Sequence, residues 1–255
     1  MKNILYEAIK DTDNMIFAEH QQSFYGRLHF HRAIEIGYII SGQSEYIVED
    51  EKISATANDI VFTHSYCSHC TKDTRENDKY VIAVSENFSN DIKNLFREVT
   101  LPVYLDDKEF NKTLLPHFEI LACKGKQMPP ILAKGYANVI FGSLSEHYEK
   151  VPLKPKNKNI SVIAETLKFI DEHYNEQITL QSIADAFGYN KTYFSRLFNN
   201  HIGMSLNNYV NMVRFDRFEE MYKNSDEKNI TNFALECGFS SLATFYRVRK
   251  FREDE

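Results

Sequence analysis

Three histidines and one glutamate in the first third of the chain have the chemistry to share one site. His29, His31 and Glu35 lie in a run of β-forming residues, and His69 follows in a later one. Side chains alternate between the two faces of a strand, so residues 29, 31 and 35 are expected to point the same way. Three imidazoles and a carboxylate can hold a divalent transition metal. The same polar groups can instead line a pocket for a small molecule.

Three interpretations of this histidine cluster (His29, His31, Glu35 and His69) stay open. The preferred one is an effector-binding pocket inside a barrel, with no metal and no cofactor. The second is a metal site formed by the same four residues. The third is that one or more of the histidines is an ordinary packed or surface residue.

A second group with ligand chemistry overlaps the cluster in sequence. His64, Cys67 and Cys70 lie close to His69, but a structural zinc site needs four converging ligands, and no second cysteine pair follows at finger spacing. We predict that these thiols are bystanders. The alternative is a redox sensor that closes a disulfide within the loop.

The surrounding pattern predicts a small barrel or double sheet. Short runs of β-branched and aromatic residues, broken by Gly, Asn and Asp, occupy roughly residues 27–85. Helical spacing follows at 88–99 and again at 131–150. The second of these segments is predicted to form one apolar stripe from Ile131, Ala137, Val139, Ile140, Leu144 and Tyr148.

A composition change marks the domain boundary. Residues 151–159 read VPLKPKNKN, with two prolines, three lysines and no aromatic residue, which is typical of an exposed linker. We therefore expect one domain over 1–150, which contains the barrel or double sheet, and an all-α domain over 160–255. The fold class is α+β.

Composition bounds the class of protein. With 255 residues and 43% hydrophobic residues, the chain can form two packed domains. No apolar run approaches the roughly 20 residues of a membrane span, and the N-terminus has no signal-peptide core. We expect a cytoplasmic protein without a membrane partner. Four scattered cysteines are too few for a disulfide framework, so reduced thiols are expected.

Two stretches of the C-terminal third have no acidic residue, although the formal net charge is −6. They are 186–215 and 237–252, and each falls where a helix-turn-helix would present its second helix. A polyanion repels carboxylates and attracts Lys and Arg. The pattern therefore favours contact with double-stranded DNA.

The first stretch belongs to a candidate helix-turn-helix. Thr179 is predicted to cap a short helix that Gly188 ends, and Asn190 to cap the next helix. Arg can bond guanine twice, Asn can pair with adenine, and Thr and Tyr can reach bases or phosphates. The predicted DNA-binding residues of this motif are Asn190, Lys191, Thr192, Tyr193, Ser195, Arg196 and Asn199.

A second copy of the same plan follows a longer helix over 206–222. Ile230, Phe233 and Ala234 form its first short helix, CGF forms the turn, and Ser240 opens the last helix. The predicted DNA-binding residues here are Ser240, Ser241, Thr244, Tyr246, Arg247, Arg249 and Lys250.

These segments resemble the AraC family of transcription regulators. The resemblance is carried by ITLQSIADAF, YFSRLFNNHIG, SLNNYVNMVR and ITNFALECGFSS, and it extends over about ninety residues from Ile160 on. It implies that one helix of each motif enters successive major grooves, and that the chain forms a homodimer that contacts RNA polymerase. The spacing HxH, three residues, Glu, six residues, Gly also resembles the first cupin motif, and His69 falls where the second motif places its histidine. Together the two resemblances imply that residues 1–150 form a cupin-like effector-binding and dimerisation domain.

The chain departs from the family at its last helix. The family ordinarily has an apolar residue where Arg249 falls, followed by a Gly, a Pro and a closing helix. We therefore expect this helix to fray and the first motif to carry most of the sequence discrimination. The second motif would add phosphate contacts through Arg247, Arg249, Lys250 and Arg252.

The predicted function is a DNA-binding transcription regulator modulated by a small-molecule effector, and not an enzyme. One alternative is a metal-dependent cupin enzyme, a dioxygenase or isomerase, with a helical appendage. That alternative leaves the repeated helix-turn-helix and the acid-free stretches without a role. The other alternative is a degenerate paralogue that no longer binds DNA.

Overall fold

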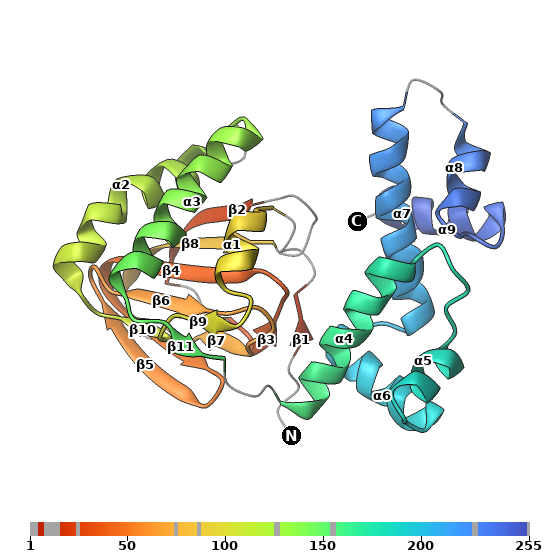
Figure 1. The fold of residues 1–255 in the computed structure, drawn as a ribbon, viewed down its shortest axis with the longest axis horizontal. Helices are drawn as coiled ribbons and strands as arrows, with labels where there is room; N and C mark the ends of the chain where they lie inside the picture. Colours follow the sequence, from red (N-terminus) through yellow and green to blue (C-terminus); the bar gives the residue numbers. More distant parts are fainter. Residues whose placement is uncertain are drawn as a thin grey trace. The chain divides into compact units, whose positions relative to one another are not determined.

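The computed structural model describes residues 5–7, 16–23, 26–73, 76–85, 88–124, 128–153, 157–225 and 229–253. The chain divides into two compact units, unit 1 over Met1–Lys156 and unit 2 over Asn157–Glu255 (Figure 1). Among the helices in the described ranges, none combines the length and apolar character that crossing a bilayer requires.

Unit 1 is built on strands that surround one long central strand. They are β1 (Leu5–Tyr6), β2 (Ile16–Gln22), β3 (His29–Phe30), β4 (Ile34–Val48), β5 (Glu51–Thr56), β6 (Ile60–Thr63), β7 (His69–Thr71), β8 (Asn77–Val84) and β10 (Tyr104–Leu105). The first half of β4 pairs with β6 and β8, and its second half pairs with β5 and β7. The cupin-like double sheet predicted from the sequence is confirmed, although the pattern did not reveal β2.

The change of partners along β4 occurs at a bulge. The register with β8 shifts between Ile39 and Ser41, and Gly42 follows with φ of 74°. A Cβ at position 42 would lie 2.2 Å from the Glu76 carbonyl oxygen, so only glycine fits there. The glycine of the cupin-like spacing is therefore needed where β4 passes from one group of partners to the other.

Helices cover one face of this sheet. They are α1 (Asn90–Leu95), α2 (Lys108–Lys124) and α3 (Pro130–His147), and a separate strand pair joins β9 (Val99–Thr100) to β11 (Val151–Pro152). Figure 1 shows α2 and α3 lying across the sheet, where Phe118, Ile140 and Phe141 join the core formed by Ile36 and Ile82. The helix expected over 88–99 is shorter than predicted: α1 ends at Leu95, and β9 begins at Val99.

The predicted apolar stripe of α3 is wrong for two residues. Ala137, Ile140 and Leu144 are fully buried, but the exposed fractions of Ile131 and Val139 are 83% and 46%. Residues in a helix are about 100° apart, so Ile131 and Ile140, nine positions apart, lie on opposite sides. The helix has an apolar inner face and a second apolar face in solvent.

Unit 2 consists of helices, drawn in green to blue in Figure 1. They are α4 (Lys158–His173), α5 (Leu180–Ala186), α6 (Lys191–Ile202), α7 (Leu206–Asn224), α8 (Ile230–Glu236) and α9 (Leu242–Glu253). Thr179 caps α5 in a capping box, and the Asn190 side chain accepts the Thr192 N–H at 2.9 Å to cap α6. Gly188 has φ of 69°. The predicted helix starts and the turn are confirmed.

The ends of two predicted segments differ in the structure. The segment expected as a linker, 151–159, contains β11 at one end and the first turn of α4 at the other, where Asn157 is the N-cap. The last helix was expected to fray, but α9 is helical through Glu253. Packing of Phe245 against Phe215 and Phe218 holds it on α7.

Candidate functional site

The exposed face of α6 carries the residues predicted to read DNA. Lys191, Thr192, Tyr193, Arg196 and Asn199 are exposed, and Ser195 is half-buried. The opposite face is buried in the core through Phe194, Leu197 and Phe198. Asn190 lies at the N-terminus of the helix, where its amide oxygen caps the first turn. The face is thus polar, basic and held on a packed helix.

The corresponding face of α9 is similar. Ser240, Tyr246, Arg247 and Lys250 are exposed, and Thr244 is half-buried. Ser241, also exposed, caps the helix by accepting the Thr244 N–H at 3.2 Å.

A cleft of about 940 Å³ brings the two motifs together. Lys191 lies at its edge from the first motif, and Ser240, Thr244 and Arg247 contribute from the second. The N-terminal half of α7 lies between them and adds Ser205, Asn207, Asn208, Asn211 and Arg214. Among the described residues that line the cleft, only Glu176 is acidic, and its carboxylate pairs with His173 at 2.9 Å.

Arg214 belongs to the basic stretch of the sequence, but its contacts are structural. Its Nε donates to the Tyr174 carbonyl at 2.7 Å and its Nη2 to the Glu176 carbonyl at 2.7 Å. Charge-assisted bonds of this kind tie α7 to the loop that leaves α4. Arg214 therefore positions the wall of the cleft.

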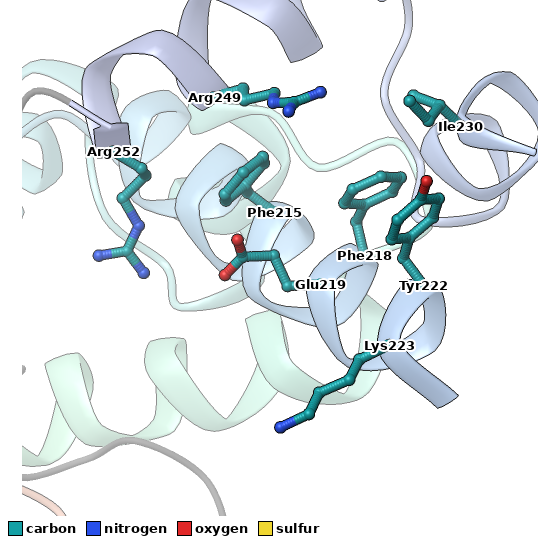
Figure 2. Close-up of a pocket in the computed structure, with 8 residues that line it drawn as sticks. All are labelled: Phe215, Phe218, Glu219, Tyr222, Lys223, Ile230, Arg249 and Arg252. Carbon is teal, nitrogen blue, oxygen red and sulfur yellow. The ribbon is translucent and has the colours of Figure 1, made fainter. Parts of the chain in front are cut away.

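Arg249 is separated from the other predicted DNA-binding residues of α9. With Arg252 it lines a cavity of about 660 Å³ over Phe215, Phe218 and Tyr222 (Figure 2). Arg252 also pairs with Asp216 on α7. Arg249 and Arg252 therefore line a different surface of unit 2 from Arg247, which lines the cleft.

Replacing Arg249 with leucine is expected to stabilise unit 2 by about 1 kcal/mol, because an apolar side chain would fill part of the cavity over Phe215 and Phe218. The measurement is the free energy of unfolding in urea. Lys250→Leu, an exposed neighbour, is the control and should not stabilise. A loss of stability in Arg249→Leu would show that the guanidinium, and not the cavity, determines the packing there.

In unit 1 the structure brings the four residues of the histidine cluster together. The Glu35 carboxylate lies 3.2 Å from His31 Nε2 and 3.5 Å from His69 Nε2. His29 pairs directly with His69 across β3 and β7, and their ring centroids are 4.2 Å apart. The His29, His31 and His69 ligand atoms all lie within 4.8 Å of one another, and His31, His69 and Glu35 are buried.

Glu7, which no sequence pattern indicated, approaches the same cluster. Its carboxylate lies 3.1 Å from His29 Nε2 because β1 pairs in parallel with β3. Burial lowers the pKa of His29, but the carboxylates of Glu7 and Glu35 outweigh it, so the net shift of the pKa is upward.

A second buried polar group lies close to Glu35 and was also not predicted. Lys79 donates to Asp73 at 2.5 Å and to Ser44 at 3.2 Å, and its ammonium lies over the Tyr46 ring. Burial lowers the pKa of Lys79, against the opposing effect of Asp73 and Glu35. Burial raises the pKa of Tyr46 far above its ordinary value, and the charges of Glu35 and Asp73 add to this. The interior of unit 1 is thus polar beyond the histidines.

The neighbouring His64 and Cys67 make backbone contacts of different kinds, and the Cys67 carbonyl oxygen lies 2.9 Å from His69 Nδ1. His64 Nε2 lies 2.9 Å from the Phe96 carbonyl, away from the other histidines. Cys67 and Cys70 are not joined in a disulfide. Within the part of the chain that the structure describes, the residues grouped with metal-ligand spacing are His29, His31 and His69.

Comparison with known proteins agrees with both units. Residues 15–92 match the model of an AraC-like ligand binding domain, and residues 183–253 match that of a helix-turn-helix domain. The probable transcription factor PqrA of Proteus vulgaris is 37% identical over 94 residues, which are 35% of this chain and 75% of that protein. An uncharacterized HTH-type transcriptional regulator of Staphylococcus aureus, SACOL0084, is 27% identical over 92 residues, 36% of this chain but only 12% of that protein. ToxT from Vibrio cholerae O395 has a TM-score of 0.41 and 14% identity, over 91% of this chain and 92% of its own.

A sheet-rich unit that matches a ligand-binding domain, followed by a unit with two helix-turn-helix motifs, defines the class of two-domain transcriptional regulators. The relation to PqrA covers most of that protein. The chain belongs to the AraC family of transcriptional regulators.

Proposed function

We propose that the protein is a sequence-specific regulator of transcription that binds double-stranded DNA through unit 2. The observation that supports this most directly is the cleft shared by Lys191 of the first motif and Ser240, Thr244 and Arg247 of the second. Two polar helix faces on either side of a basic cleft suit successive major grooves with phosphates between them. Arg249 and Arg252 are left out of this surface because they line the other cavity.

The test is selection of genomic DNA fragments by the purified full chain, followed by binding measurements at several salt concentrations. Affinity should fall linearly with the logarithm of salt, with a slope of about −0.9 for each phosphate contacted. Equal binding to all fragments would contradict sequence specificity. Absence of binding in dilute buffer would contradict the proposal and favour a paralogue that has lost DNA binding.

We propose further that unit 1 senses an effector at the histidine cluster, and that the protein is a regulator rather than an enzyme. The match of residues 15–92 to a ligand-binding domain supports the sensor role. An effector changes DNA binding only if it favours one of two arrangements of the protein. Contact with RNA polymerase stays a prediction.

The exposed apolar face of α3 supports a homodimer. Ile131, Leu132 and Val139 are exposed on one side of the helix. Gly135 and Gly142 lie on the same side, and a Cβ at either would meet open space. The glycines leave room for a second helix to approach closely, and the large apolar side chains beside them supply the surface to be buried. In a symmetric dimer each copy offers the same face.

Val139→Glu is expected to weaken dimerisation about 30-fold, because a symmetric interface would bring two carboxylates into an apolar contact. Analytical ultracentrifugation of the full chain measures the dissociation constant. Lys112→Glu, which changes the charge at an exposed position of α2, is the control and should leave the constant unchanged. A wild-type chain that sediments only as a monomer would contradict the proposal.

A further inference from the structure

We propose that unit 2 binds a small aromatic monoanion, such as an aromatic carboxylate, in the cavity between α7, α8 and α9. The cavity has a volume of about 660 Å³, which is within the usual range for small-molecule sites. Among the described residues, none lines both this cavity and the cleft proposed to bind DNA. The cavity is therefore a ligand site of its own within the helical unit.

One wall of the cavity is a row of aromatic rings on α7. Phe215, Phe218 and Tyr222 lie three and four positions apart, so they share one face of the helix. The ring centroids of Phe215 and Phe218 are 5.9 Å apart, and those of Phe218 and Tyr222 are 5.4 Å apart. Ile230 of α8 adds an apolar contact (Figure 2). Such a surface favours an aromatic ligand, because ring pairs gain stacking or edge contacts beyond the area that they bury.

Basic side chains outnumber acidic ones around these rings. Arg249 and Arg252 of α9 and Lys223 of α7 line the cavity. The acidic residue among its described lining residues is Glu219, and Asp216 of α7 pairs with Arg252. Three cations therefore face two carboxylates, which leaves one positive charge. A ligand with one negative charge balances it.

Arg249 is the group best placed to hold the anion. It is half-buried, and Figure 2 shows its side chain reaching over the rings of Phe215 and Phe218. Lys223, in contrast, is exposed and points away from the rings (Figure 2). A guanidinium beside an apolar wall has lost part of its water, so its bonds to an anion are stronger than those at a fully exposed site. Its planar fork can also bond two oxygens of one carboxylate.

The test is titration of the full chain with two fluorescent probes. One is anilinonaphthalene sulfonate, an aromatic monoanion, and the other is phenylnaphthylamine, which lacks the sulfonate. Arg249→Met removes the charge but keeps a long side chain, so it should weaken binding of the sulfonate about 10-fold through the loss of charge-assisted bonds. The uncharged probe should bind this variant within about 2-fold of the wild type, since its contacts are with the rings.

Glu219→Gln should change the affinity for the sulfonate in the opposite direction. The Glu219 carboxylate repels an anion in the cavity, so its removal should strengthen binding about 3-fold. Glu219 is exposed, so the substitution leaves the packing of unit 2 intact. Far-ultraviolet circular dichroism shows whether Arg249→Met has folded, and if it has not, an unchanged affinity in Glu219→Gln overturns the proposal.

Lys250→Met and Glu220→Gln are the matched controls. Each removes the charge of the residue that follows a lining residue, and neither is among the described residues that line the cavity. Both should bind the sulfonate as the wild type does. Equal losses in Lys250→Met and Arg249→Met would show that overall charge attracts the probe, and would overturn the proposal. A folded Arg249→Met that binds the sulfonate as tightly as the wild type would also overturn it.

Retardation of selected DNA by the same preparations separates this proposal from the proposed function. If the chain retards DNA but Arg249→Met leaves the affinity for the sulfonate unchanged, the ligand site fails and the regulator stands. If the chain binds the sulfonate through Arg249 but retards no DNA, the regulator proposal fails while the ligand site is supported.

Discussion

Replacing Gly238 with alanine is expected to destabilise unit 2 by about 3 kcal/mol. Gly238 has φ of 86°, a conformation that alanine adopts only at a cost. A Cβ there would also lie 2.6 to 2.8 Å from backbone atoms of Asn175. Backbone cannot rotate away as a flexible side chain can, so either the turn between α8 and α9 or the loop after α4 must move.

The loop that Gly238 touches is also held from its other side. Arg214 donates to the carbonyls of Tyr174 and Glu176, on either side of Asn175. A displaced Asn175 would therefore disturb α7 as well as the second motif. The variant is expected to lose DNA affinity together with stability, because the cleft depends on the same loop.

Gly188→Ala is the matched control for this prediction. Gly188 occupies the corresponding turn of the first motif with φ of 69°, but a Cβ there would meet no atom within 4 Å. Only the conformational cost remains, about 1 kcal/mol. Thermal unfolding of both variants, followed by far-ultraviolet circular dichroism, compares them. Equal losses of stability would show that the contact with Asn175 is unimportant.

The helical motifs were predictable because their signals are local. Thr179, Gly188 and Asn190 act on the turn in which they lie, and their capping contacts connect residues two or three positions apart. The prediction of one buried stripe on α3 was partly wrong because burial depends on contacts with distant segments. Helical spacing shows that Ile131 and Val139 can lie on a face, but it does not say which face another element covers.

The site in unit 1 was predictable only in part. The sequence grouped His29, His31 and Glu35 on one strand, and the cupin-like spacing added His69. The single strand was wrong, because β3 ends at Phe30, His31 lies in the connection that follows, and Glu35 belongs to β4. The residues still meet, because their side chains converge in the interior of unit 1. Glu7 reaches His29 through a parallel pairing of β1 with β3, and Lys79 meets Asp73 and Ser44 across the interior. Pairings of this kind depend on how distant segments meet, which a single sequence pattern does not contain. Arg249 shows the converse, since its charge suggested DNA contact while its position on α9 places it at the other pocket, beside Phe215 and Phe218.

The double substitution Lys191→Ala and Arg196→Ala is expected to weaken binding to a selected DNA site by about 3 kcal/mol, which is about 150-fold. Both side chains lie on the exposed face of α6. Fluorescence anisotropy at several salt concentrations should also show a shallower salt slope, by about 1 to 2. Lys168→Ala with Lys223→Ala removes two charges elsewhere in unit 2 and should change affinity little. If the control pair lost as much affinity as the α6 pair, binding would depend on overall charge, and α6 would not be the reading helix.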